Sequence, residues 1–474
     1  MSKKYLYGAS VQGIQSFIMK TNDLKPIIGA SELVDRICTS MFEEFTFSAK
    51  GCVENIVRAA GNVKVVFHEK DDCANAFKEF PRKVMLAAPG ITISQAVVVF
   101  EDPDGYSAAV DELEQKLRAE RNRPARPLYP GVIGMARSPK TGEPACTTLN
   151  GEYVDLATAR KLDVNANGKG NRQDYTGLVR KAFGHDVEEL LVDNDRLAGE
   201  NGWLAVVHID GNGFGKIVQQ HGKDRKLFPK ISASIDKCTR DAFREAFDPV
   251  CGNEGEPYPI RPLVLSGDDV TFICRGDIAV PFVEKFMEEF ERQTRQSLDI
   301  PGQLTACAGV AFMKPSYPFY YAYNLAESLC HAAKVDSDRA HSCLMFYKIQ
   351  DSIISDWKVM AARELNYDGG SFMFGAYYLA SEGGKSPVAG RWTIGELNDR
   401  VKVLAGNGNM KSALRRWVSA MYADAGKARQ LKERFCLVNP GLKEEFYKMA
   451  DADSGRCPAY DILTMASISG KPVV

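Results

Sequence analysis

The sequence predicts an α/β protein of the α+β type, with two ferredoxin-like domains that have antiparallel sheets and a helical C-terminal domain. Three observations support this prediction. Region 203–347 alternates short apolar strands with amphipathic helices in the order β-α-α-β-β-α-β-α-β. Region 4–122 repeats nearly the same order, and region 350–474 has apolar residues mainly at helical spacing.

We therefore expect a first domain at 1–122, a connecting segment at 123–200, a second domain at 201–349 and a helical domain at 350–474. A chain of 474 residues can form two or three domains with sizeable cores. Its 45% hydrophobic and 26% charged residues are ordinary for a soluble globular protein. The formal net charge of -1 excludes a protein that is basic throughout, although it allows a local RNA-binding groove.

The N-terminal segment and the cysteines indicate where the protein works. The segment YLYGASVQGIQ is too polar for a signal-peptide core, and no apolar run is long enough to span a membrane. We therefore expect a cytoplasmic protein without membrane contact. The 12 cysteines form no Cys-x-x-Cys pair, so we expect buried thiols rather than a disulfide framework or a zinc site.

The most informative stretch is a predicted hairpin. Leu263–Leu265 and Val270–Cys274 read as strands, and the turn between them is Ser266-Gly267-Asp268-Asp269. Aspartate is common in turns, so ordinary turn chemistry is one explanation of the acidic pair. The small residues Ser266 and Gly267 would also allow backbone N–H groups to approach a phosphate closely.

A third carboxylate favours a metal site. Residues 203–209 are apolar except for His208, as in a buried strand, and Asp210 follows at the strand end. Carboxylate oxygens suit Mg²⁺ or Mn²⁺, and two such ions would activate an attacking hydroxyl and stabilise a leaving pyrophosphate. We therefore predict that Asp210, Asp268 and Asp269 bind two ions. For His208, a core role is favoured over a proton relay.

The segments HIDGNGFGKI, LSGDDVTF and AGVAFMKPSYPFYYAYNLAESLCHAAK resemble the catalytic palm of the CRISPR-associated polymerase/cyclase family, the large subunits of type III CRISPR effector complexes. This palm is related to GGDEF cyclases. The family signature Gly-Gly-Asp-Asp corresponds here to Ser266-Gly267-Asp268-Asp269. The resemblance implies a nucleotidyltransferase that converts ATP into cyclic oligoadenylate messengers for antiviral defence.

The resemblance also implies roles for individual residues. By position, Asp210, Asp268 and Asp269 would be catalytic metal ligands. A lysine that complements a helix C-terminus is the alternative for Lys334, and turn or core roles are the alternatives for Asn212 and Phe214. The residues that would bind nucleotide are Gly211, Asn212, Phe214, Ser266, Gly267 and Lys334.

A second match lies in the first domain, where VQGIQSFIMKTNDLKPIIGASELVDRI resembles the opening of the same family. The predicted hairpin tip there is Ala59-Ala60-Gly61-Asn62, and the first strand ends in Gly8-Ala9-Ser10 without an acid. We therefore expect the first domain to be a catalytically degenerate palm.

The connecting segment lacks the cysteine cluster that binds zinc in many family members, since Cys146 stands alone after TGEPA. We expect no zinc. The dipeptide His185-Asp186 is too isolated for the nuclease domain that opens other members. Several basic residues in and just before the segment are candidates for RNA contact, with a solvated linker as the commoner explanation: Arg118, Arg121, Arg123, Arg126, Lys161, Lys169 and Arg172.

The expected partners follow from this interpretation. They are ATP, guide or target RNA and other effector-complex subunits. Two alternatives remain open. One is a stand-alone synthase of cyclic dinucleotides that works outside a CRISPR complex as a homodimer, and the other is a non-enzymatic scaffold that binds RNA or nucleotides.

Overall fold

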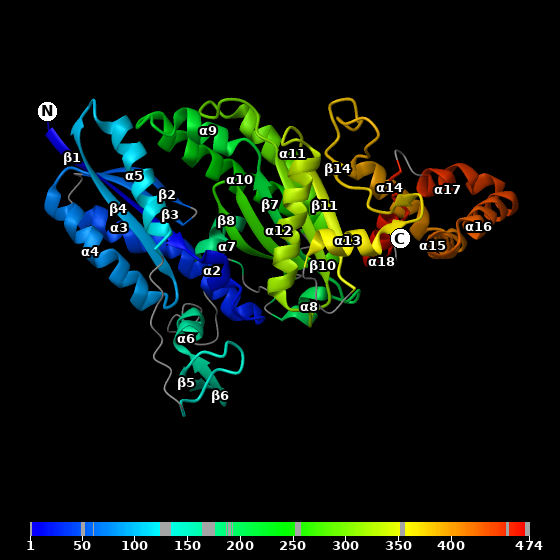
Figure 1. The fold of residues 1–474 in the computed structure, drawn as a ribbon, viewed down its shortest axis with the longest axis horizontal. Coiled ribbons are helices and arrows are strands. Elements are labelled where there is room, and N and C mark those ends of the chain that lie inside the picture. Colours follow the sequence, from blue (N-terminus) through cyan, green and yellow to red (C-terminus); the bar gives the residue numbers. More distant parts are fainter. Residues whose placement is uncertain are drawn as a thin grey trace.

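The structure is a computed structural model that describes residues 2–48, 53–59, 61–123, 134–163, 176–185, 187, 191, 193–251, 257–350, 356–451 and 455–469. The first sheet lies at one end of the molecule, the second sheet in the middle and the C-terminal helices at the other end (Figure 1). Among these residues, no helix combines the length and the apolarity needed to cross a bilayer.

The first sheet has four strands in the order β2-β3-β1-β4, and each neighbouring pair is antiparallel. Helices cover both of its faces, because Tyr7 of β1 belongs to the main core whereas Leu6 packs with Leu113 in a separate cluster. The strands are β1 (Ser2–Gln12), β2 (Val53–Ala59), β3 (Asn62–Phe67) and β4 (Thr92–Asp102), and the helices are α1 (Ile14–Ile18), α2 (Leu24–Cys38), α3 (Ser40–Ser48), α4 (Lys70–Ala87) and α5 (Tyr106–Arg121).

The second sheet has six strands in the order β14-β11-β10-β7-β9-β8. Its strands are β7 (Leu204–Gly211), β8 (Ile260–Ser266), β9 (Asp269–Arg275), β10 (Ala306–Met313), β11 (Cys343–Lys348) and β14 (Tyr377–Tyr378). Its helices are α9 (Phe214–His221), α10 (Leu227–Cys251), η1 (Gly276–Ile278), α11 (Ala279–Gln296) and α12 (Phe319–Asp336). The run β8-β9-β7-β10 repeats the order β2-β3-β1-β4, which confirms the internal repeat.

The edge of the second sheet departs from the antiparallel order that the sequence predicted. β11 pairs parallel to β10, because α12 crosses between them and returns the chain in the same direction. Beyond it, β14 pairs antiparallel to β11. Since β14 lies after residue 350, the C-terminal part of the chain completes the second sheet as well as forming helices.

The second sheet is also covered on both faces. α12 packs so closely on β10 that a Cβ at Gly309 would lie 1.9 Å from the carbonyl oxygen of Ala326. On the opposite face, the ring of Phe272 packs against Phe243 of α10 and Phe282 of α11. His208 of β7 lies on the α12 side, with its ring centroid 5.9 Å from that of Tyr323. Side chains alternate along a strand, so Asp210 also faces α12.

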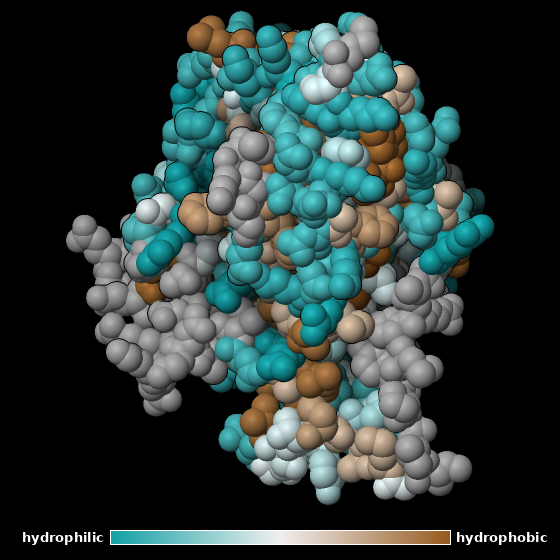
Figure 2. Space-filling view, turned by 90° about the vertical axis from the view of Figure 1, so that its left-hand side faces the viewer, coloured by the Kyte–Doolittle hydropathy of each residue, from teal (hydrophilic) through white to brown (hydrophobic). Residues whose placement is uncertain are grey.

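Residues 145–163 of the connecting segment form a small lobe below α2, whereas its later helices, at 176–183 and 194–198, lie against the second sheet domain (Figure 1). Figure 2 shows apolar side chains gathered on the protruding lobe at the bottom of that view, and exposed apolar residues of the lobe include Leu149, Tyr153 and Leu156. The elements of the segment are β5 (Ala145–Leu149), β6 (Glu152–Asp155), α6 (Leu156–Asp163), α7 (Thr176–Phe183) and α8 (Asn194–Ala198).

The burial of Lys161 on α6 contradicts the RNA contact that was predicted for this residue. Its side chain is fully buried, and its Nζ donates to the carbonyl oxygen of Phe17 at 2.5 Å and lies 4.2 Å from the centroid of the Phe17 ring. The lysine therefore anchors α6 on α1. Arg118, Arg121 and Arg123 are exposed, so their contact with RNA stays a prediction, while Arg126, Lys169, Arg172 and Asp186 lie outside the described residues.

The C-terminal region is mostly helical, as predicted. It also contains a short two-stranded sheet and the strand that joins the second sheet. Its elements other than β14 are α13 (Trp357–Glu364), β12 (Asn366–Tyr367), β13 (Gly370–Ser371), α14 (Ile394–Ala405), α15 (Gly408–Ala423), α16 (Ala425–Val438), η2 (Pro440–Leu442), α17 (Lys443–Ala450) and α18 (Ala459–Ile468).

Candidate nucleotide and metal site

The three predicted aspartates come together at one end of the second sheet. Asp210 and Asp269 are direct partners in the register of β7 and β9. Asp268 lies in the turn before β9, and its carbonyl oxygen accepts a hydrogen bond of 3.2 Å from the N–H of Gly211. A Cβ on Gly211 would lie 2.7 Å from the Cβ of Asp268, so the close approach of the turn to β7 requires glycine there.

The environment raises the pKa of two of these carboxyl groups. Burial, together with the charge of Asp210, raises the pKa of Asp268 and of Asp269 to about 7. One carboxylate oxygen of Asp269, Oδ1, is buried, has no hydrogen-bond partner among the described residues and lies 3.5 Å from Nδ1 of His208. A divalent cation would satisfy this acceptor and neutralise the group, so the donor set suits Mg²⁺ or Mn²⁺.

The side chains are not arranged around an ion as they stand. Within the part of the chain that the structure describes, no three His, Cys, Asp or Glu side chains form a group that could hold a metal. Instead, Nζ of Lys334 lies 2.7 Å from Oδ2 of Asp210 and donates to the carbonyl oxygen of Gly211 at 2.9 Å. Lys334 therefore reaches the acidic site from the last turn of α12, and its contact with a phosphate stays a prediction.

His208 has the environment of a core histidine. It is buried, and its Nδ1 lies 3.0 Å from Oγ1 of Thr271 on β9. Burial lowers its pKa, which favours the neutral ring. The hydrogen bond and the packing against Tyr323 account for this residue without a proton relay.

Asn212 braces the turn after β7. Its Nδ2 donates to Oγ1 of Thr305 at 3.0 Å and to Sγ of Cys307 at 3.3 Å, while its Oδ1 is buried and has no hydrogen-bond partner. Phe214 begins α9 and packs on the core. Both residues thus have structural roles, and their nucleotide contacts stay predictions.

The hairpin turn is held by a residue that the sequence did not single out. Gly267 has φ +65°, a conformation that glycine adopts without strain, and its N–H donates to Oδ1 of Asp236 on α10 at 3.0 Å. Asp236 in turn pairs with Arg240 at 3.0 Å. The N–H of Gly267 therefore donates to a carboxylate, and the contact of Ser266 and Gly267 with a phosphate stays a prediction.

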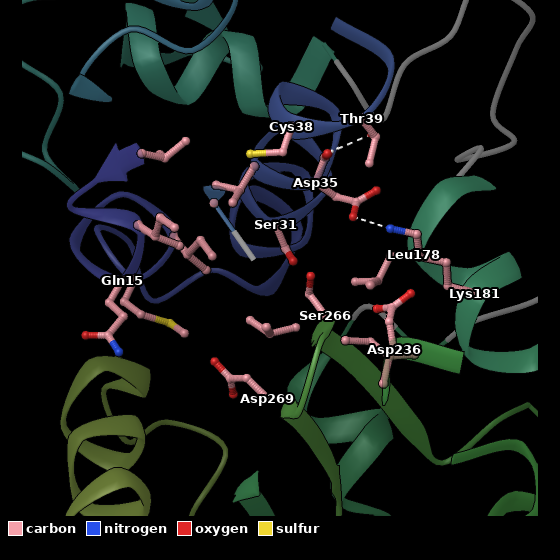
Figure 3. A pocket seen from close by; sticks show the side chains of 18 of the residues that line it. Gln15, Ser31, Asp35, Cys38, Thr39, Leu178, Lys181, Asp236, Ser266 and Asp269 are labelled. Atoms are coloured by element: carbon pink, nitrogen blue, oxygen red, sulfur yellow. Dashed lines mark hydrogen bonds and ion pairs between the residues drawn. The ribbon is translucent and has the colours of Figure 1, made fainter. Parts of the chain in front are cut away.

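A cavity of about 480 Å³ lies beside this turn, between the two sheets (Figure 3). This volume is within the usual range of small-molecule sites. Ser266, Asp269 and Tyr323 line it from the second sheet domain, and Figure 3 shows Ser266 opposite Ser31 of α2. The lining residues that the sequence analysis did not propose include the cations Arg58, Lys181 and Arg240 and the polar residues Gln15, Ser31, Asp35, Thr39 and Asp236.

Direct hydrogen bonds join the two domains at this cavity. Nε2 of Gln15 on α1 donates to the hydroxyl of Tyr323 on α12 at 2.9 Å. Oγ of Ser31 on α2 donates to the carbonyl oxygen of Leu263 on β8. Both residues lie in the N-terminal segment that resembles the opening of the family. This resemblance is the one feature of the sequence that could have pointed to α1 and α2 as a wall of the cavity.

The equivalent tip of the first sheet has no acidic pair. In the register of β1 and β3, Ser10 lies opposite Asn62, as Asp210 lies opposite Asp269. Oγ of Ser10 donates to Oδ1 of Asn62 at 3.0 Å. A neutral hydrogen bond therefore stands where the second sheet has two carboxylates.

Comparison with known proteins supports the fold and the family. Residues 203–343 match the family described as "Cas10/Cmr2, second palm domain". A solved Csm1 from T. onnurineus has a TM-score of 0.59 and 14% identity, with 98% of this chain and 70% of that chain covered. A Csm1-Csm4 cassette in complex with cA3 has a TM-score of 0.56 and 13% identity over the same shares.

A further Csm1-Csm4 cassette, in complex with AMPPNP, has a TM-score of 0.55 and 13% identity, again over 98% of this chain and 70% of that chain. Identities this low show a shared fold. No curated protein matches the sequence. The family match of residues 203–343, which include the acidic hairpin, and the fold shared over nearly the whole chain agree with the resemblance found in the sequence: this part of the chain is a palm domain similar to the second palm of Cas10/Cmr2 proteins.

Proposed function

We propose that this protein is a metal-dependent nucleotidyltransferase that converts ATP into cyclic oligoadenylates. The observation that carries the proposal is the position of Asp210, Asp268 and Asp269 at the end of β7 and β9, with Asp269 lining a cavity that both sheet domains form. With the three carboxylates turned toward bound cations, this arrangement would unite a cation-binding donor set with a space for nucleotides.

Different residues of the chain would contribute metal binding and positive charge to the reaction. The three aspartates would hold two Mg²⁺ or Mn²⁺ ions, which supply charge to the attacking ribose hydroxyl and the leaving pyrophosphate. Lys334, fixed between β7 and α12, adds a positive charge to the same site. Arg58 and Lys181, which also line the cavity and pair with Glu43 and Asp35, would supply cations that suit triphosphate oxygens. Positioning and charge therefore account for most of the expected catalysis.

The similar structures favour adenine nucleotides as ligands. They include complexes of Csm1-Csm4 cassettes with cA3, cA4, AMPPNP and one ATP. By analogy, we propose ATP as substrate, a cyclic oligoadenylate as product and a Csm4-like subunit as partner. Guide or target RNA, antiviral defence and a cytoplasmic location belong to the same proposal.

The two alternatives differ from this proposal in what activates the site. A stand-alone synthase would form product without RNA or partner subunits, and a scaffold would form none. The test is to incubate labelled ATP and Mn²⁺ with the purified chain, with and without RNA and partner subunits, and to resolve the products by chromatography. Cyclic products support the proposal, whereas unchanged ATP under every condition favours the scaffold.

A further inference from the structure

Two lysines lie over the ring of Trp203 at the boundary between the second sheet and the C-terminal helices, and two further cations lie near one of them. Nζ of Lys314 lies 3.9 Å, and Nζ of Lys348 lies 4.4 Å, from the centroid of the indole ring. Lys411 and Arg415, one turn apart on α15, act electrostatically on Lys348. We call Lys314, Lys348, Lys411 and Arg415 the Trp203 cluster.

The charges of the Trp203 cluster are not balanced within the part of the chain that the structure describes, where none of its members forms an ion pair with a carboxylate within 4.0 Å. Their hydrogen-bond acceptors are neutral. Lys314 donates to the carbonyl oxygen of Gly202 at 2.9 Å, Lys348 to Oγ of Ser467 at 2.8 Å and Lys411 to the carbonyl oxygen of Ala466 at 3.1 Å.

Burial and mutual repulsion both act against these charges. Burial lowers the pKa of Lys348, and the neighbouring cations Lys314, Arg415 and Lys411 lower it further. Burial and Arg415 similarly lower the pKa of Lys411. The indole face attracts Lys314 and Lys348 through cation–π contacts, but it supplies no negative charge that would balance the four cations. A bound anion would relieve the remaining repulsion.

The Trp203 cluster is separate from the candidate catalytic site. Trp203 precedes the first residue of β7, whereas Asp210 lies near its last residue. At about 3.3 Å per residue, the two ends of the strand are roughly 20 Å apart. Lys314 directly follows β10 and Lys348 is the last residue of β11, so both lie at the same end of the strands as Trp203. The other two cations come from α15 in the helical region.

We propose that the Trp203 cluster binds the phosphodiester backbone of a nucleic acid. Lys314 and Arg415 are exposed, while Lys348 and Lys411 are half-buried, so the cations lie at different depths of an open boundary. Phosphodiester groups repeat along a flexible chain and can therefore meet cations at several depths, whereas carboxylates on a folded protein surface are fixed in place. Because two ammonium groups already lie over the indole ring, the contact is to the backbone and not to stacked bases.

The experiment measures binding of fluorescent single-stranded RNA, and DNA of the same length, to the full chain without ATP, by anisotropy across a range of salt concentrations. The double variant Lys314→Gln/Arg415→Gln removes the two exposed charges. We expect its affinity to fall at least tenfold, and the slope of log K against log[salt] to decrease by about 1.5 in magnitude. Arg416→Gln, an exposed neighbour on the same helix, is the matched control and should bind as the wild type does.

Thermal melting separates loss of binding from loss of folding. Removing two mutually repelling charges should leave the melting temperature of the double variant unchanged or higher. RNA bound more tightly than DNA would identify the sugar as a second determinant, and equal binding would identify the backbone alone; both support the site. Equal affinities of wild type and double variant, or complete competition by millimolar inorganic phosphate without dependence on oligonucleotide length, would overturn it. Neither result bears on the ATP chemistry, which is tested without this variant.

Discussion

Nζ of Lys334 lies 2.7 Å from Oδ2 of Asp210 and ties the last turn of α12 to the end of β7. The lysine side chain is 11% exposed, and the aspartate side chain is 42% exposed. The ion pair places a cation beside the carboxyl groups of Asp268 and Asp269, and its charge lowers the pKa of both, against the larger effects of burial and of Asp210. Lys334 is therefore a positive charge fixed within the acidic site itself.

Replacing Lys334 tests the importance of this charge. We expect Lys334→Met to lower ATP turnover on the order of tenfold or more, because a fixed cation no longer offsets the charge of the aspartates and the phosphates. Stability should fall only modestly, since Asp210 is partly exposed. The measurement is ATP turnover together with a thermal melt. Lys285→Met, which removes a lysine that pairs with Glu289 on α11, is the control, and equal turnover in the two variants would refute this role.

The packing of α12 on the sheet gives a second prediction. A methyl group at Gly309 would lie 1.9 Å from the carbonyl oxygen of Ala326 and 2.5 Å from the nitrogen of Cys330, so α12 would have to move. We expect Gly309→Ala to destabilise the protein by about 3 kcal/mol or more and to displace Lys334.

Gly215→Ala is the matched control, because a Cβ at Gly215 in α9 would meet nothing within 4 Å. This variant should be neutral or more stable by about 0.5–1 kcal/mol. Denaturant unfolding of both variants checks the pair. Equal denaturant midpoints for the two variants would contradict the prediction, because they would show that α12 can move away from β10 without loss of stability.

The buried ammonium of Lys161 predicts a pH dependence of stability. Burial lowers its pKa to about 8, whereas a lysine in the unfolded chain has a pKa of about 10.4. Between these values the unfolded chain binds more protons than the folded chain, so stability rises with pH from about 8 to about 10.4. Relative to Lys161→Met, the wild type should gain up to about 3 kcal/mol over this range. Parallel pH profiles of unfolding for the two proteins would contradict the prediction.

The absence of paired cysteines in the sequence predicts a protein without bound zinc. Cys146 is exposed and is the cysteine nearest to the expected position of the family's zinc cluster. Elemental analysis of the purified protein should therefore find far less than one zinc per chain. A stoichiometric amount that resists dialysis against a chelator would show that other side chains form a zinc site.

The strand pattern made much of this fold predictable. Alternation of apolar residues located both sheets, and the position of the acids predicted that Asp210 would face the acidic turn. The register of β7 and β9 then shows that its direct partner is Asp269. The strand β11 was expected, but its parallel pairing with β10 was not, because a strand pattern carries no direction. The burial of a charged side chain is equally hard to predict from the sequence. Nothing near Lys161 in the sequence shows that its ammonium would meet the carbonyl oxygen of Phe17, a contact between residues 144 positions apart.

The cavity could not be predicted from the sequence either. Asp236 and Arg240 lie on α10, where acidic and basic residues at a spacing of four are ordinary features of a solvated helix. Only the fold shows that Asp236 holds the N–H of Gly267 and that Lys181 of the connecting segment reaches the same space. Such sites form from several segments, and their residues carry no shared local signal.

The most direct test of the central claim compares the two hairpin tips. Labelled ATP is incubated with Mg²⁺ or Mn²⁺ and with the wild type, Asp268→Asn/Asp269→Asn or Asn62→Ala, under the condition that gives product with the wild type. The Asp268/Asp269 variant keeps the side-chain shapes, removes both charges and should lose turnover at least 100-fold while melting at or above the wild-type temperature in the absence of metal. Asn62→Ala, at the neutral tip, should retain most of the turnover. Full turnover by the Asp268/Asp269 variant would contradict the account, because the site of ATP chemistry would then lie elsewhere in the chain.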